Sequence, residues 1–234
     1  MPEFDPQTAI ENAAGYSRYL RARLDARPEL LDWLTATCQA PFTRRDMEAF
    51  LAETAIADED SLKRRLRDLR QRVMANIIVR DLAGEADLTE VTVACTDLAE
   101  VAFGFACDWH HRDLAEIHGE PLDSQGRPQK LIVVGMGKLG GRELNVSSDV
   151  DPIFVYPEDG ETTGPRRLSS HEFFVRLGRR LINAIGETTY DGFVFRVDMR
   201  LRPYGDEGPL ASSFAMLEEY FYTQAREWER YAWI

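Results

Sequence analysis

Residues 135–151 have the sequence GMGKLGGRELNVSSDVD, a glycine-rich stretch that ends in two aspartates separated by one residue. The second aspartate lies in the run Val150 to Tyr156, which is typical of a β-strand closed by Pro157. Side chains two positions apart on a strand leave the same face, with Cα atoms about 6.6 Å apart. Asp149 and Asp151 would repel each other at that spacing, and a shared divalent cation removes the penalty. The spacing therefore predicts a site for Mg²⁺, with Mn²⁺ as an alternative.

A third carboxylate on a neighbouring strand would complete a two-ion site, with the metals roughly 3.5–4 Å apart. Residues 193–201 alternate between apolar and mostly charged side chains, which predicts a strand with one charged face. Asp198 lies on that face between Arg196 and Arg200. On this strand alone, an ion pair with the arginines is slightly favoured. Together with the paired aspartates, a third metal ligand is the stronger interpretation.

Glycines follow the run Leu131–Val134, which is predicted to be a buried strand. A strand that runs into Gly-x-Gly lets backbone amides approach a phosphate closely. The spacing of a Walker A loop is absent, and so is the wider context of a dinucleotide-binding fingerprint. Gly137 and Lys138 are therefore predicted to contact phosphate oxygens; a structural turn and a solvated lysine are comparable alternatives.

Four further polar residues are candidates for phosphate or nucleotide binding. Ser147 and Ser148 precede the aspartates and either hydrogen-bond to phosphate oxygens or cap the turn before the strand. Arg200 and Arg202 share a face of the predicted strand and would stabilise charge on a transferred phosphoryl group. Surface salt bridges are an equally good interpretation of these two arginines.

Composition narrows the function classes. The 234 residues suit one large domain or two small ones. A net charge of −12 argues against nucleic acid as the main partner. Three cysteines without a CxxC pair favour a reducing cytoplasm over a disulfide framework. The first residues lack the features of a signal peptide, and no apolar run approaches the ~20 residues of a membrane span.

Residues 1–120 are predicted to form a helical region. Leu62, Leu66, Leu69 and Val73 repeat at helical spacing. Asp87 is placed as the N-cap of the next helix. His110 and His111 are expected at a solvated helix end rather than in a metal site.

Residues 121–234 are predicted to form an α+β catalytic core with a small mixed sheet, truncated at its C-terminal helices. Ser169 is expected to cap one helix, and a last helix begins at about Ser213. Four apolar side chains of that last helix are expected to be buried: Phe214, Leu217, Phe221 and Trp228.

A glycine turn followed by SDVD and a later strand aspartate resembles the polymerase-β-like nucleotidyltransferase superfamily. Residues 135–151, together with FRVDMRLRPYGDEGPLASSF at 195–214 and WERYA at 228–232, resemble the bacterial glutamine synthetase adenylyltransferase/adenylyl-removing enzymes. The resemblance covers about residue 60 to the end of the chain. It implies the fold of that superfamily for residues 121–234, behind a helical N-terminal bundle.

The resemblance also implies a reaction. In that family one domain uses phosphate to remove AMP from a tyrosine of glutamine synthetase and releases ADP, and a second domain attaches AMP from ATP. The position of the motif and the segment RPYGDEGPL favour the N-terminal, adenylyl-removing domain. Glutamine synthetase is the implied protein substrate, and a PII signalling protein is an implied partner. AMP transfer from ATP is an alternative, because both domains share the aspartates.

Pro152 departs from the family pattern, which has an aliphatic residue after the second aspartate. Proline lacks an amide hydrogen and is normally excluded from central strands. We therefore expect an edge position, a bulge or a distortion that mis-aims Asp151. The chain also stops at Ile234 inside a helical pattern, so missing helices would expose a binding surface. These two features motivate a further alternative, a non-catalytic regulatory or docking fragment.

Overall fold

The computed structural model describes residues 4–233, and the chain separates into two compact units. Unit 1 comprises Met1–Val101, Arg142–Ser147 and Tyr190–Val194. Unit 2 comprises Ala102–Gly141, Ser148–Thr189 and Phe195–Ile234. The helix α6 contributes its first part to unit 1 and its second part to unit 2. The predicted boundary between 1–120 and 121–234 stays a prediction.

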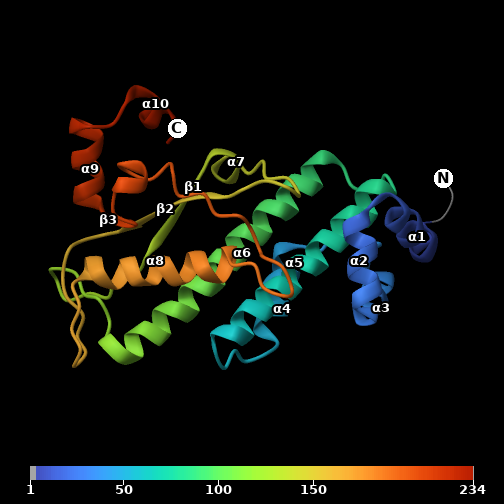
Figure 1. The fold of residues 1–234 in the computed structure, drawn as a ribbon, viewed down its shortest axis with the longest axis horizontal. Coiled ribbons are helices and arrows are strands. Elements are labelled where there is room, and N and C mark those ends of the chain that lie inside the picture. The colour runs from blue at the N-terminus through green and yellow to red at the C-terminus, as the bar shows by residue number, and fades with distance from the viewer. Residues whose placement is uncertain (1–3, 234) are drawn as a thin grey trace. The chain divides into compact units, whose positions relative to one another are not determined.

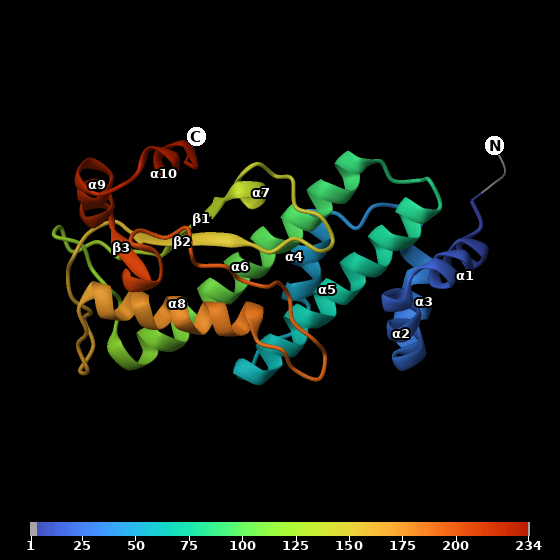
Figure 2. The same cartoon turned by 45° about the horizontal axis from the view of Figure 1, so that its top comes forward.

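Unit 1 is helical, as its sequence predicts (Figure 1). Five of its helices are α1 (Pro6–Tyr16), α2 (Arg18–Ala26), α3 (Pro28–Thr37), α4 (Arg44–Ala52) and α5 (Glu59–Leu82), and α6 (Leu88–His118) begins there. Figure 2 shows α1, α2 and α3 grouped at one end of α5. No helix in the described part of the chain is long and apolar enough to span a membrane.

The predicted helix signals of unit 1 are confirmed. The stripe Leu62, Leu66, Leu69 and Val73 of α5 is completely buried. Asp87 accepts the amide hydrogen of Glu90 at 2.7 Å and so caps α6. These contacts follow from the 3.6-residue repeat, which gathers the apolar side chains on one face.

Unit 2 combines a small sheet with helices, which confirms the α+β prediction (Figure 1). Its strands are β1 (Ile132–Met136), β2 (Asp151–Tyr156) and β3 (Ala211–Ser213), in the order β1-β2-β3. β1 pairs with β2 antiparallel and β3 pairs with β2 in parallel, so the sheet is mixed. The helices are α7 (Gly137–Gly140), α8 (Ser170–Gly186), α9 (Phe214–Thr223) and α10 (Glu227–Tyr231), with a 3₁₀ turn at Gly205–Glu207. Ser169 caps α8 as predicted, accepting the Glu172 amide at 3.1 Å.

Pro152 is buried inside β2, which is central in the strand order and pairs with β1 without a bulge, so of the three expectations only the edge position holds, and only locally. Val150 donates its amide to Arg196 O at 2.9 Å, on the side away from β1. Amides along a strand alternate between its two sides, so the nitrogen of Pro152 faces the same side as that of Val150. There it falls between the bridge at Val150 and the ladder with β3, which begins at Phe154. The missing amide hydrogen therefore breaks no bond to β1.

The predicted strand at residues 193–201 is also wrong. The structure contains only an isolated parallel bridge there, between Val150 and Val197. The segment belongs partly to each unit, with Val194 in unit 1 and Phe195 in unit 2. A period of two therefore describes how the side chains alternate, although no continuous partner strand accompanies them.

Two burial predictions need correction. β1 is an edge strand, and its Ile132 is 40% exposed, so the strand is not buried as predicted. His110 and His111 lie buried within α6 rather than at a solvated helix end. His111 Nε2 lies 2.8 Å from a carboxylate oxygen of Glu120, and its ring packs edge-on against Phe173. The contact with Phe173 joins residues that lie far apart in the sequence, so no local sequence pattern predicts it.

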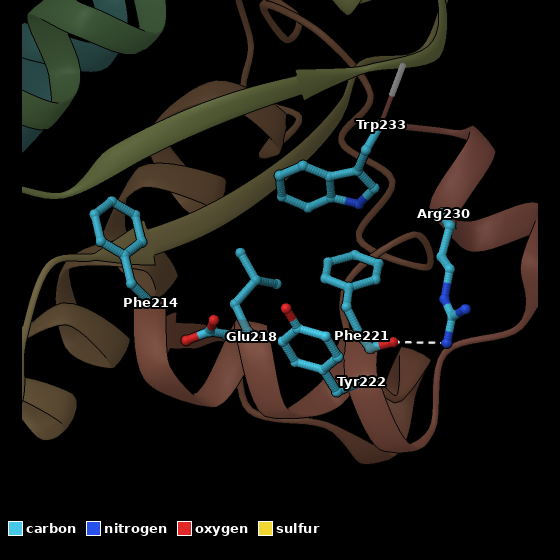
Figure 3. A pocket seen from close by; sticks show the side chains of 7 residues that line it. Phe214, Glu218, Phe221, Tyr222, Arg230 and Trp233 are labelled. Atoms are coloured by element: carbon cyan, nitrogen blue, oxygen red, sulfur yellow. Dashed lines mark hydrogen bonds between the residues drawn. The ribbon is translucent and has the colours of Figure 1, made fainter.

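The last helix begins where predicted, with Ser213 as the N-cap of α9, but its apolar stripe is not buried. Phe214 is 47% exposed, and Trp228 is 51% exposed and belongs to α10. Phe221, Tyr222 and Trp233 line a cavity of about 760 Å³. Figure 3 shows these side chains around the resulting aromatic groove. Arg230 closes one end by donating to the carbonyl oxygen of Phe221 at 2.7 Å.

Candidate active site

The two aspartates of the SDVD sequence lie at the start of β2. Val150 between them is completely buried, whereas Asp149 is exposed and Asp151 is half-buried. This alternation places both carboxylates on the face opposite Val150. In the ladder, Asp151 lies opposite Met136, the last residue of β1. The glycine-rich turn therefore begins directly beside the second aspartate.

Asp198 reaches the same place through the bridge at Val150. Its amide donates to Val150 O at 2.8 Å, and Val150 in turn donates to Arg196 O. These two bonds place Asp198 next to the first residue of β2 although no regular strand surrounds it. The three predicted metal ligands are thus brought together within unit 2.

The carboxylates influence one another electrostatically. Burial raises the pKa of Asp151 above its usual value, and the negative charges of Asp198 and Asp149 raise it further. A hydrogen bond from Arg200 lowers the pKa of Asp198. Asp151 is therefore the aspartate of the cluster whose ionised form is disfavoured by the neighbouring negative charges.

Two arginines currently neutralise the other two acids. Arg196 forms an ion pair with Asp149, and Arg200 donates through Nε to both carboxylate oxygens of Asp198 at 2.9 and 2.8 Å. In this arrangement no group of three His, Cys, Asp or Glu side chains within residues 4–233 is arranged to hold a metal ion. The arginine side chains are 61% and 77% exposed, and exposed ion pairs of this kind contribute at most about 1 kcal/mol.

The fold requires glycine in this turn for two different reasons. A Cβ on Gly135 would lie 2.7 Å from the Leu139 side chain, and one on Gly140 would lie 2.5 Å from the carbonyl oxygen of Gly135. These two glycines therefore let α7 fold tightly against β1. Gly137 instead has a φ of +54° and lies beside the site, where its Cβ would be 3.6 Å from Asp151 Oδ2. The backbone at Gly137 is thus open toward the carboxylates.

The other residues predicted to contact phosphate do not all lie in the same unit as the aspartates. Lys138 follows Gly137 and is exposed on α7. Ser148 directly precedes Asp149 in unit 2. Ser147 belongs to unit 1, where its amide and hydroxyl both donate to Asn145 Oδ1, at 3.0 and 3.1 Å. The structure thus gives Ser147 the turn-capping contacts of the alternative interpretation.

Arg202 has other partners than Arg200. Its Nη1 donates to Met199 O at 2.8 Å and to Asp206 Oδ1 at 3.2 Å. It also lines a cavity together with His171 and Arg179 of α8. No local sequence signal singles out these two α8 residues, although their spacing of eight puts them on one helix face.

The donor set suits a hard divalent cation. Magnesium prefers carboxylate oxygens and commonly retains water and phosphate ligands, which a half-exposed cluster of three aspartates permits. A cation would also remove the mutual repulsion that raises the pKa of Asp151. For this to occur, Arg196 and Arg200 must leave Asp149 and Asp198, and both arginine side chains reach solvent.

Comparisons with known proteins agree with the motif. The family model described as glutamate-ammonia ligase adenylyltransferase matches residues 8–234. Three relatives carry the name bifunctional glutamine synthetase adenylyltransferase/adenylyl-removing enzyme. The chain is 52% identical to the one from Nitrosomonas eutropha over 96% of its length, 55% to the one from Burkholderia mallei over 94%, and 52% to the one from Ralstonia nicotianae over 100%. The matches cover 25%, 24% and 25% of those proteins, so the chain spans about a quarter of their length.

Proposed function

The chain belongs to the glutamate-ammonia ligase adenylyltransferase family, and we therefore propose that its unit 2 carries a nucleotidyltransferase site that removes AMP from adenylylated glutamine synthetase. The single observation that supports this is the convergence of Asp149, Asp151 and Asp198 beside the open backbone of Gly137. The activity would serve the control of nitrogen assimilation in the cytoplasm, with a PII protein as a further partner.

In the proposed reaction an oxygen of inorganic phosphate attacks the phosphorus of the AMP–tyrosine ester. The bond from phosphorus to the tyrosine oxygen breaks, that oxygen gains a proton, and ADP leaves. Asp149, Asp151 and Asp198 would hold Mg²⁺ or Mn²⁺, which supplies charge neutralisation to the phosphate oxygens. The chain's own contribution is mainly positioning, as in phosphoryl transfer generally.

The neighbouring residues have supporting roles in this proposal. The amides around Gly137 approach phosphate oxygens, and Lys138 adds a positive charge from α7. Arg196 and Arg200, once released by their aspartates, become available to the incoming phosphate. The direction of the reaction, removal rather than transfer, rests on the likeness of residues 202–210 to the removing domain.

The test supplies the chain with adenylylated glutamine synthetase, phosphate and Mg²⁺ and measures ADP. We expect Asp149→Asn and Asp151→Asn each to lower the rate at least about a hundredfold, because a metal ligand is lost. Asp108→Asn, which neutralises an exposed acid elsewhere in unit 2, is the matched control. Equal rates in the parent and in a folded Asp149→Asn variant would rule the proposal out.

Two further arms separate the alternatives. Incorporation of AMP from ATP into unmodified glutamine synthetase, without ADP formation in the first assay, would assign the opposite direction of transfer. Absence of both activities, together with no aspartate-dependent heat on titration with Mn²⁺, would favour a regulatory or docking fragment.

A further inference from the structure

A cavity of about 520 Å³ in unit 2 lies between one face of α8 and the segment that leads into β3. Its polar wall contains three nitrogen-rich side chains, those of His171, Arg179 and Arg202. Its apolar wall is formed by Val175, Ile182, Pro209 and Leu210. No acidic side chain lines the cavity in the described part of the chain, although the whole chain carries a net charge of −12.

Arg202 has a donor that the fold leaves unused. Its side chain is only 11% exposed, and its Nε atom is buried without a hydrogen-bond partner in the described structure. Leaving a buried guanidinium donor unpaired is unfavourable, and an acceptor supplied by a ligand removes that cost. The guanidinium of Arg202 is thus incompletely paired within the described fold, and it lines a cavity without acidic side chains, which suits a ligand with an anionic oxygen.

The acidic partner of Arg202 is easily replaced. Asp206 lies 3.2 Å from Nη1, at the long end of hydrogen-bond distances, and its side chain is 80% exposed. Arg179 is exposed on α8 and forms no ion pair or hydrogen bond with another residue of the described chain. His171 adds positive charge only when its ring is protonated, so the two arginines carry the site.

We propose that this cavity binds a small organic anion, with a phosphate or carboxylate group held by Arg179 and Arg202 and a short apolar part packed against the aliphatic wall. Guanidinium groups suit both kinds of head group, because they offer paired donors to two oxygens at once. None of the three acids of the carboxylate cluster lines this cavity, and the proposal does not depend on the function proposed for that cluster.

The experiment titrates the chain by calorimetry with propyl phosphate and with butyrate, at constant ionic strength and with EDTA present. The two probes have similar apolar parts, so they distinguish a phosphate ester from a carboxylate as the preferred head group. We expect saturable binding of at least one probe and a loss of about tenfold or more in affinity for Arg179→Gln. Arg179→Lys should restore part of the affinity, because the charge returns without the planar pair of guanidinium donors.

Matched variants make the outcome decisive. Arg176→Gln removes the same charge from α8, but Arg176 pairs with Glu172 and does not line the cavity, so binding should be unchanged. Asp149→Asn should also bind normally, which separates this site from the proposed active site. No saturation by either probe up to about 10 mM, or equal losses for Arg179→Gln and Arg176→Gln, would overturn the inference.

Discussion

The Nε atom of Arg200 lies 2.8 Å from Oδ2 of Asp198, so the third acid of the cluster is already paired with a cation of the chain itself. Arg196 forms the corresponding ion pair with Asp149. Both arginine side chains are largely exposed, so breaking either ion pair costs little free energy. A divalent cation would therefore compete with two arginines rather than enter a bare cluster.

This competition predicts that Arg200→Gln tightens Mn²⁺ binding. An exposed pair contributes at most about 1 kcal/mol, so the affinity should rise by up to about fivefold. Calorimetric titration with Mn²⁺ measures the effect. Arg167→Gln removes a similarly exposed arginine that pairs with Glu161, and it serves as the control. Weaker Mn²⁺ binding in Arg200→Gln than in Arg167→Gln would show that Asp198 is not a ligand.

The three aspartates of the site were predictable because the alternation of side chains along a strand determines which of them share a face. A spacing of two on a strand fixes Asp149 and Asp151 on one face, and the charged face at residues 193–201 identifies Asp198. The sequence pattern nevertheless predicted a strand where the structure has one bridge at Val197. Alternation shows which side chains face the same way, whereas a strand also needs a partner over its length.

Other features depended on contacts between distant segments. His171 and Arg179 lie on α8, and only the fold brings Arg202 to the same cavity. The apolar repeat of α9 likewise predicted burial, yet Phe214 is 47% exposed, because the described residues cover only part of its side chain. Periodicity identifies an apolar face, but the partner that covers the face lies outside the pattern.

Gly178 provides a test of packing between α8 and β2. A Cβ at this position would lie 2.9 Å from the ring of Phe154, a buried strand residue. We expect Gly178→Ala to lower the free energy of unfolding by about 1–3 kcal/mol, as overpacking does in other cores. The midpoint of urea unfolding measures the change.

Gly104 is the matched control for that substitution. It lies in the interior of α6, is exposed, and has no atom within 4 Å of an added Cβ. Gly104→Ala should raise stability by roughly 0.5–1 kcal/mol through helix propensity alone. Equal effects of the two substitutions would mean that α8 does not pack closely on Phe154.

The thiols of Cys95 and Cys107 are predicted to resist alkylation. Burial raises the pKa of each thiol to about 12, so the thiolate fraction at pH 8 is about one in ten thousand. Iodoacetamide at pH 8 should therefore modify both residues slowly in the native chain and rapidly in urea, as followed by peptide mass spectrometry. Native modification of Cys95 at the rate of the urea-unfolded chain would contradict its burial.

Arg80 and Glu90 form the strongest candidate for a stabilising ion pair in unit 1. Arg80 is only 5% exposed. Its guanidinium donates to Glu90 through Nε at 2.6 Å and through Nη2 at 3.0 Å. It also donates to three backbone carbonyl oxygens. The hydrogen bond that Arg80 donates to Glu90 is the main cause of the raised pKa of Arg80. Glu90→Gln keeps the shape but leaves a buried cation without its counter-charge, which should lower the free energy of unfolding by about 2–4 kcal/mol. Glu59→Gln, which breaks an i,i+4 pair between Lys63 and the more exposed Glu59, should cost about 0.5 kcal/mol or less. The two urea midpoints decide the matter, because a Glu90→Gln loss no larger than that of Glu59→Gln would mean that the carbonyl oxygens alone hold Arg80.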